Sequence, residues 1–366
     1  MSNKNHFSET FDDGTKAKLE IFRNYFNEWL PVFISSEKNN YWKNIFIYDF
    51  FSGEGMDCDN NYGSPLIILD VLNRSDNVLK TSVKINVILN DMKKKRYNIL
   101  EKNVSNFKYD KEKIKVRIFN KSFKDLFLEL YPKMIKNKEL PRLMFLDQFG
   151  IKEITEDIFK KLVSFKRTDF IFFISSSFIN RFSGQNEFQN YIKITKKEFE
   201  KSKPFHCHKV VFEYYKSLID TDYMLAPFSI KKGKNIYGLI FGSNHSYGIE
   251  KFLKVAWKIN PNTGDANFNI DEEKIIDGQF SMFEEDNTIK KLGLLEKEIK
   301  KEIFVNKEKS LHRIYLKTLE FGCLPKHCNE ILRKLVKENK IEPVKTVREK
   351  IHKLINKPIE IKKKIK

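Results

Sequence analysis

Along residues 1–270, short apolar runs alternate with amphipathic helical segments, and this alternation restricts the fold more than any other feature of the sequence. Nearly continuous apolar runs separated by helices are typical of a parallel sheet that helices cover on both faces. We therefore predict an α/β fold with a Rossmann-like sheet. The predicted strands are Ile45–Asp49, Val83–Leu89, Lys115–Phe119, Leu143–Leu146, Phe170–Ile174 and Tyr237–Phe241.

Three helices are predicted in the same region from the spacing of their apolar residues. The first covers about Thr15–Leu30. The second runs to Leu72, with Ser64 as its cap and Pro65 at its first position, where proline is well tolerated. The third spans Lys93–Lys102, directly after the second strand.

Polar residues follow the first three strands, at the edge where parallel sheets bind ligands. The first strand is followed by Asp49, Ser52, Gly53 and Gly55, and glycines let the backbone approach a ligand closely. Asp91 ends the second strand, where a carboxylate can accept hydrogen bonds from both hydroxyls of a ribose. Ser122 follows the third strand, where an adenine would lie. The pattern predicts a nucleotide-type cofactor.

The fourth strand ends at Asp147, Gln148 and Phe149, where a transferable group usually meets its acceptor. Two features favour S-adenosylmethionine over NAD as the cofactor. The first turn reads D-F-F-S-G-E-G rather than G-x-G-x-x-G, and no nicotinamide-type element follows the fourth strand. An NAD-dependent oxidoreductase remains an alternative interpretation.

Seven segments in this region are similar to the three-Cys-motif partner (TcmP) family, whose members have a class I methyltransferase-like fold. Each segment is short, but together they span roughly residues 11–260 in the order of the family. The segments are Phe11–Lys18, Tyr48–Gly55, Gly63–Leu66, Asp91–Tyr97, Phe145–Gly150, Phe178–Arg181 and Tyr237–Lys258, the last with Tyr237–His245 and Ala256–Lys258 as its matching parts.

The resemblance implies an S-adenosylmethionine-type pocket at the strand ends already named. It also implies a protein partner with a three-cysteine motif and a place in a multi-component system, such as antiviral defence. The family usually has Asp-Pro-Phe-Gly where this chain has Gln148, an element similar to the Asp-Pro-Pro-aromatic signature of amino-methyltransferases. The family's histidine in the first segment is Gly14 here. Both departures bear on methyl transfer more than on the fold.

Charge divides the chain into a long first part and a strongly basic end. The whole chain carries 68 Lys+Arg against 49 Asp+Glu, a surplus of 19 positive charges, which is typical of proteins with a polyanionic partner. Residues 287–366 hold 23 Lys/Arg against 10 Asp/Glu, whereas 271–286 hold seven acids and one lysine. We therefore predict an N-terminal helical element at 1–40, a methyltransferase-like domain at 41–270, an acidic linker at 271–290 and a basic winged-helix domain at 291–366.

The basic end is predicted to fold as helix, turn, helix and wing. Ser310 caps a helix over Leu311–Leu319 that Gly322 ends, and Lys340–Val344 is the candidate wing strand. A second helix after Leu324-Pro325 has one apolar face, and its other face is basic. Such a helix can enter the major groove of DNA, although winged helices also serve as protein-docking modules. The candidate nucleic-acid contacts are Lys326, Asn329, Arg333, Lys334 and Lys337, with Arg333 and Asn329 as base readers and Arg181 as a further anion contact.

Other sequence features restrict the location of the protein and its cofactors. The four cysteines are too few for a disulfide framework and form no C-x-x-C pair. No apolar run approaches the ~20 residues of a membrane span, and Met1–Gly14 shows no apolar core of the kind expected in a signal peptide. We expect a cytoplasmic protein without a metal site. Its predicted function is a methyltransferase acting on or bound to nucleic acid; the alternative is a non-catalytic binding subunit that retains the fold.

Overall fold

The computed structural model describes residues 9–34, 42–148, 150–185, 190–200, 207–233, 235–267 and 285–364. The chain divides into two compact units. The first unit holds the residues up to Tyr223 together with Ile230–Asn244, and the second holds Met224–Ser229 together with everything from His245 onward.

A seven-stranded sheet has the order β3-β2-β1-β4-β5-β7-β6. Strands β1 to β5 pair in parallel, and β7 pairs antiparallel with β5. This order with a reversed β7 is that of the predicted Rossmann-like class I methyltransferase sheet. The strands are β1 (Asn44–Asp49), β2 (Lys84–Asn90), β3 (Ile114–Phe119), β4 (Arg142–Leu146), β5 (Thr168–Ile174), β6 (Met224–Lys232) and β7 (Asn235–Ser243).

The hairpin of β6 and β7 adds an antiparallel pair to the parallel strands that the apolar runs predict. The sixth predicted run belongs to β7, and the prediction missed β6 before it. The two strands are separated by Gly233 and one further residue, and Gly233 has φ +57°, a conformation suited to a tight turn. Two lysines at the end of β6 interrupt its apolar pattern, so the strand is hard to recognise in the sequence.

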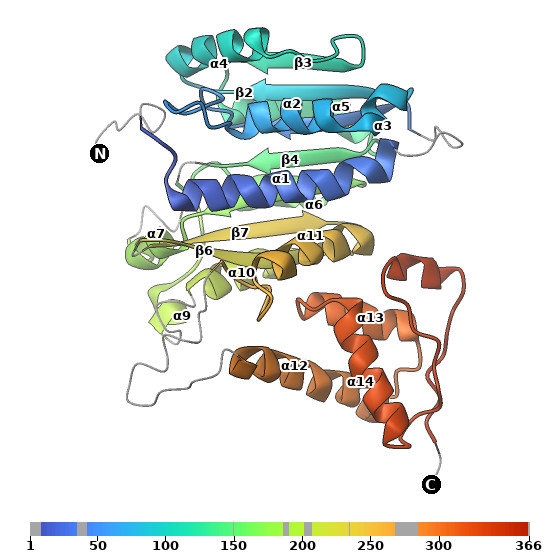
Figure 1. Ribbon diagram of the computed structural model, residues 1–366. Coiled ribbons are helices and arrows are strands. Elements are labelled where there is room, and N and C mark those ends of the chain that lie inside the picture. Colours follow the sequence, from blue (N-terminus) through green and yellow to red (C-terminus); the bar gives the residue numbers. More distant parts are fainter. Residues whose placement is uncertain are drawn as a thin grey trace. The chain divides into compact units, whose positions relative to one another are not determined.

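Helices cover both faces of the sheet, as Figure 1 shows for α1 and α2 on the near face and α5 and α6 behind it. Phe22 of α1 packs on Phe145 of β4 with ring centroids 4.2 Å apart, and Phe159 of α6 contacts Phe172 of β5. The Tyr25 hydroxyl donates to the buried carboxylate of Asp169 at 2.6 Å. Helix α1 is thereby anchored to the middle of the sheet.

The helices of the first unit confirm the three predicted ones and add others. Gly63 rather than Ser64 occupies the cap position of α2, and Ser64 is its first residue, so the predicted serine cap is wrong by one position. The first-unit helices are α1 (Asp13–Ile34), α2 (Ser64–Arg74), α3 (Asp76–Lys80), α4 (Lys94–Asn106), α5 (Phe123–Lys136), α6 (Glu156–Val163), α7 (Ser176–Phe182), α9 (Lys196–Glu200) and α10 (Cys207–Ser217).

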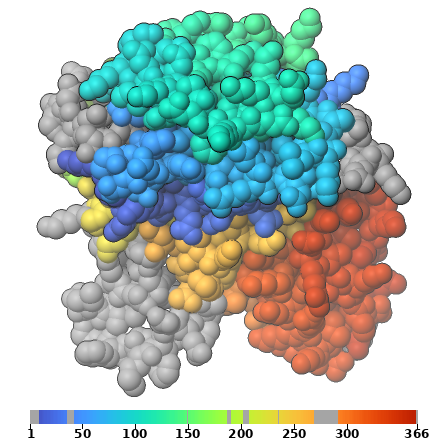
Figure 2. All heavy atoms as spheres, turned by 45° about the horizontal axis from the view of Figure 1, so that its top comes forward, coloured from blue at the N-terminus to red at the C-terminus, as the bar shows by residue number. Residues whose placement is uncertain are grey.

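In the described part of the second unit, the regular elements are helices and a part of β6. The atoms of its C-terminal helices, drawn in red, pack into one block in Figure 2. Ser310 caps α13 by accepting from the Arg313 amide, and Gly322 follows the helix with φ +74°, as predicted. The elements are α11 (Ser246–Ile259), α12 (Glu285–Lys300), the π-helical turn η3 (Lys301–Val305), α13 (Leu311–Glu320), α14 (Pro325–Lys337) and the 3-10 turn η4 (Ile351–Ile355).

The wing strand and the end of the acidic linker differ from the prediction. The predicted wing strand at 340–344 is only an isolated bridge from Ile341 to Lys363, with a second bridge from Ser310 to Glu360. Residues 271–284 of the predicted acidic linker lie outside the described residues, and its last six residues, 285–290, belong to α12. Among the helices that the structure describes, none has the length and apolarity needed to cross a membrane.

Candidate functional site

The loop after β1 is held against the end of β2 by short backbone contacts. The Ser52 amide donates to the Asn90 carbonyl at 2.9 Å, while its hydroxyl donates to the Asp49 carbonyl and accepts from the Asn90 amide. Gly53 has φ +64°, which residues other than glycine rarely adopt. Ser52 therefore shapes the loop, and Gly53 lets the chain turn at the carboxyl edge of the sheet.

Asp91 joins this loop to the end of β2. One carboxylate oxygen accepts the Gly53 amide at 3.1 Å and the other accepts the Lys93 amide at 2.8 Å. Burial raises the pKa of Asp91, although the hydrogen bonds from these two amides oppose the shift. A carboxylate can accept about four hydrogen bonds, so Asp91 has capacity for two more donors, such as the hydroxyls of a ribose.

Asp49 is fully buried at the end of β1. Its Oδ1 accepts the Phe51 amide at 3.2 Å, whereas Oδ2 has no well-aligned hydrogen bond among the described residues. Burial raises the pKa of Asp49 to about 7, although the nearby Ser64 hydroxyl opposes the shift, and the negative charge of Asp147 adds to it. Asp49 is thus an acid near its titration point at neutral pH.

Asp147 faces a residue that the sequence did not reveal. The Lys18 ammonium of α1 forms an ion pair with Asp147, and its nitrogen lies 5.4 Å from the ring centroid of Phe173. The Lys18 and Asp147 side chains are only 18% and 27% exposed, so the pair is shielded more than a surface ion pair. The arrangement of an ammonium against a carboxylate and an aromatic face is one that also suits an amine ligand.

The other residues predicted at this edge have structural partners. The Gln148 Oε1 accepts the Ile154 amide at 3.2 Å and so closes the loop after β4. Ser122 caps α5 by accepting the Asp125 amide at 3.1 Å. Gly55, at φ +91°, packs near Leu100 of α4. Phe149 lies outside the described residues.

Two asparagines that were not among the predicted site residues connect these loops. The Asn90 amide nitrogen donates to the carbonyls of Phe50 and Lys121, and its oxygen accepts the Lys121 amide. Asn120 donates to the Asp91 carbonyl at 2.8 Å. The signal was visible in the sequence, because each asparagine stands at the end of a predicted strand, where side-chain amides often bond neighbouring loops.

Three of the eight buried side-chain polar atoms that lack a partner among the described residues belong to this edge. Among the described residues they include Asp49 Oδ2, Glu54 Oε1 and Gln148 Nε2, which all belong to the loops or strand ends after β1 and β4. A buried polar atom without a partner is costly, and such groups commonly face a ligand or water. The presence of three such atoms along one edge of the sheet makes it a candidate binding site.

Arg181 lies away from the interior, on the exposed side of α7. Its guanidinium donates to the Asn235 side chain of β7 at 3.2 Å. Its role as an anion contact remains a prediction.

The polar residues of α14 divide into exposed cations and one buried amide. Lys326, Arg333, Lys334 and Lys337 are exposed, and Lys334 pairs with Glu296 of α12 at 3.0 Å. The Asn329 side chain is buried, accepts from the Tyr315 hydroxyl and donates to the Val347 carbonyl. Both ends of the Asn329 amide are therefore occupied, which leaves Arg333 as the predicted base reader.

Comparison with known proteins identifies the C-terminal part of the chain. Residues 269–348 match the model of the GMT-like wHTH domain family. No curated protein matches the chain. The winged-helix prediction for the basic end is confirmed at the level of this domain.

The chain is also similar to solved methyltransferase structures over about two thirds of its length. Trm1 from Pyrococcus horikoshii with S-adenosyl-L-methionine is 13% identical over 68% of this chain, at a TM-score of 0.39, and the chain spans 60% of that protein. The O-methyltransferase TomG from Streptomyces achromogenes in complex with SAM is 9% identical over 66% of this chain and 99% of its own, at a TM-score of 0.34. Because both TM-scores are low, the fold assignment depends on the strand order and not on these two structural similarities.

The raised pKa of Asp49 predicts a fall in stability with rising pH. The folded chain holds a proton on Asp49 that the unfolded chain releases near 3.8, so the unfolding free energy declines as pH rises from about 4 to about 7. Asp49→Asn should flatten this decline, measured by urea unfolding across that range. In a carboxyl ¹³C NMR titration, the Asp49 midpoint should lie near 7 and should drop in Asp147→Asn, because a nearby negative charge is removed. Asp110→Asn, in an unrelated loop, serves as the control, and an Asp49 midpoint near 4 would contradict the account.

Proposed function

We propose that this protein is an S-adenosylmethionine-dependent methyltransferase that acts on nucleic acid held by its C-terminal winged-helix unit. The observation that carries the proposal is the cluster of buried acids and unpartnered polar atoms, among the described residues, at the carboxyl ends of β1, β2 and β4. In sheets of this type that edge is the ligand-binding edge. The adjoining GMT-like wHTH segment supports nucleic acid as the partner.

The residues at the edge fit such a cofactor in charge and capacity. Asp91 has two unused acceptor positions for ribose hydroxyls, beside the Gly53 turn. Asp49 offers a buried oxygen without a well-aligned partner among the described residues, which suits the ammonium of an amino-acid moiety. The Ser122 hydroxyl both accepts and donates within its own helix cap, so any contact with an adenine requires a lone pair left over from the cap.

When bound, S-adenosylmethionine supplies a methyl group on a positively charged sulfur, so the protein has mainly to position the acceptor. We assign Asp147 to holding an acceptor amine, and the ion pair with the Lys18 ammonium supports this role. Phe173 provides an aromatic face beside that ammonium. We assign Gln148 to loop closure and retain Phe149 as the residue that would stack on a base.

A non-catalytic subunit is the second candidate, and one observation favours it. The ion pair of Lys18 with Asp147 already satisfies the acid that would hold the acceptor, and Gln148 stands where the similar family has proline. In that case the fold would bind a nucleotide or a partner without transferring a methyl group. For the proposed methyltransferase we also propose a three-Cys-motif partner and a role in antiviral defence, on the strength of the family resemblance alone. The cytoplasmic location is proposed from the small number of cysteines.

Removal of the Asp91 charge should weaken cofactor binding. Asp91→Asn should reduce the affinity for S-adenosylhomocysteine about tenfold or more, since a hydrogen bond to a charged group contributes roughly 1.5–3 kcal/mol. The measurement is isothermal titration calorimetry of the full chain. Asp110→Asn is the matched control, because Asp110 also accepts two backbone amides, of Glu112 and Lys113, but stands in the loop before β3. Equal affinities for the two variants would contradict the assignment of Asp91 to the site. If wild type gives no binding heat, the assignment of the cofactor itself is wrong.

Substitutions at the ion pair separate the two candidate functions. Asp147→Asn should reduce methyl transfer from tritium-labelled S-adenosylmethionine to mixed-sequence DNA or total RNA by about 100-fold or more, as expected when a positioning group is removed. Cofactor affinity should stay within about tenfold, because Asp147 handles the acceptor. Lys18→Met keeps the length of the side chain and removes its charge, so it reports whether the ion pair helps or obstructs transfer. If wild type binds the cofactor and transfers nothing to either nucleic acid, the second candidate function is correct.

Removing cations from α14 should weaken nucleic-acid binding and its salt dependence. For each phosphate that the protein no longer neutralises, the slope of log affinity against log salt becomes shallower by about 0.7 to 0.9. The triple variant with alanine at Lys326, Arg333 and Lys337 should show this change in filter binding at two salt concentrations. The control removes three exposed lysines of the first unit, at positions 102, 138 and 216. If both triple variants bind equally weakly, binding follows net charge and not the winged-helix unit.

A further inference from the structure

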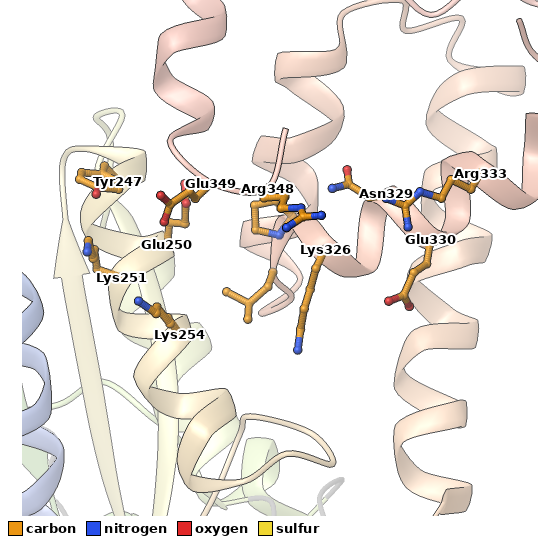
Figure 3. Close-up of a pocket in the computed structure, with 12 residues that line it drawn as sticks. Tyr247, Glu250, Lys251, Lys254, Lys326, Asn329, Glu330, Arg333, Arg348 and Glu349 are labelled. Atoms are coloured by element: carbon orange, nitrogen blue, oxygen red, sulfur yellow. The ribbon is translucent and has the colours of Figure 1, made fainter. Parts of the chain in front are cut away.

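A groove of about 510 Å³ lies within the second unit, between α11 and the first half of α14. Figure 3 shows Tyr247, Lys251 and Lys254 along α11 on one side of it, and Lys326 and Arg333 on α14 on the other. Arg348, from the segment after α14, lines the groove between the two helices. The lining residues of each helix recur at a spacing of three or four positions, so each helix presents one face to the groove.

The two walls of the groove are fastened to each other. The Glu250 carboxylate of α11 accepts the Lys350 amide at 2.7 and 3.0 Å and the Ile351 amide at 3.3 Å. Farther along α11, the Trp257 ring nitrogen donates to the Gly322 carbonyl at 2.9 Å, and its ring lies 4.3 Å from that of His327 in α14. The groove is therefore a formed feature of the unit, with side-chain contacts on both sides of it.

Positive charge predominates on the lining. Five cations face three carboxylates there, and both oxygens of Glu250 already accept backbone amides. Lys254, Lys326, Arg333 and Arg348 are all exposed to solvent. The groove thus offers cations from three chain segments to an anion that runs between the helices.

We infer that this groove holds the sugar–phosphate backbone of a single nucleic-acid strand and contacts it from both walls. The inference rests on the proposed nucleic-acid function and names the form of the partner. A helix that reads duplex DNA enters the major groove, about 12 Å wide, with its face free of other protein. Here the face with Lys326 and Arg333 lies across from the lysines of α11. Proteins that bind single strands combine a charged groove with aromatic side chains on which bases stack, and Tyr247 supplies one aromatic ring to this groove.

The test compares single-stranded and duplex probes on the full chain. We expect wild type to bind an oligothymidylate or oligouridylate of about 12 nucleotides more tightly than a hairpin duplex of similar length. Lys254→Ala should weaken the single-strand affinity several-fold and lower its salt slope by about 0.7, and Lys254→Ala with Arg333→Ala by about 1.4. Lys258→Ala is the matched control, because Lys258 is also exposed and one turn along α11 but does not line the groove.

The outcomes separate this inference from the proposed function. Equal weakening of binding in Lys254→Ala and Lys258→Ala would overturn the inference that the groove holds the strand, but it would leave the proposed nucleic-acid binding intact. Tighter binding of the duplex, unaffected by Lys254→Ala, would mean that α14 reads DNA outside the groove. Failure of wild type to bind either probe would overturn the proposed nucleic-acid function itself. Thermal unfolding of each variant shows whether weaker binding comes from misfolding.

Discussion

The hydrogen bond from the Gly53 amide to Asp91 is the contact on which the candidate site depends. It ties the glycine turn after β1 to the end of β2, 38 positions later in the chain. Asn90 and Asn120 extend this connection to the loop after β3. Three loops that come from separate strands are thus held as one rigid rim, and Asp49 lies buried beneath it. A ligand at this edge meets preformed partners, which reduces the entropy that its binding must overcome.

The parallel strands could be predicted well from the sequence because a buried parallel strand requires a continuous apolar run, which few other structures produce. All five lie within about two residues of their predicted positions. Lys18 could not be predicted, because its partner Asp147 is 129 positions away and nothing local signals the pair. The sequence predicted Asn329 as a base reader. Its hydrogen bond to the Val347 carbonyl could not be predicted, because Val347 lies in a segment without regular structure. The predicted wing failed for a similar reason, since its bridge partner lies at the end of the chain.

Helix α11 has a role that neither its sequence position nor its pattern indicated. It follows β7 directly, so the predicted domain boundary placed it in the methyltransferase-like domain. Its Glu250 and Trp257 instead hold the winged-helix segment through backbone groups of Lys350, Ile351 and Gly322. The GMT-like wHTH match begins only at residue 269, and the compact unit therefore extends beyond the family domain. This extension supplies one wall of the basic groove, and it adds Lys251 and Lys254 to the cations that the domain itself contributes.

Hydrogen–deuterium exchange of the full chain with and without S-adenosylhomocysteine tests the central claim most directly, because it reads the rim without requiring any activity. The account predicts slower exchange at residues 50–55, 90–93 and 119–122 when the ligand is present, with little change in α14. Unchanged exchange in all three loops at saturating ligand, or protection confined to other elements, would contradict the assignment of this edge as the cofactor site.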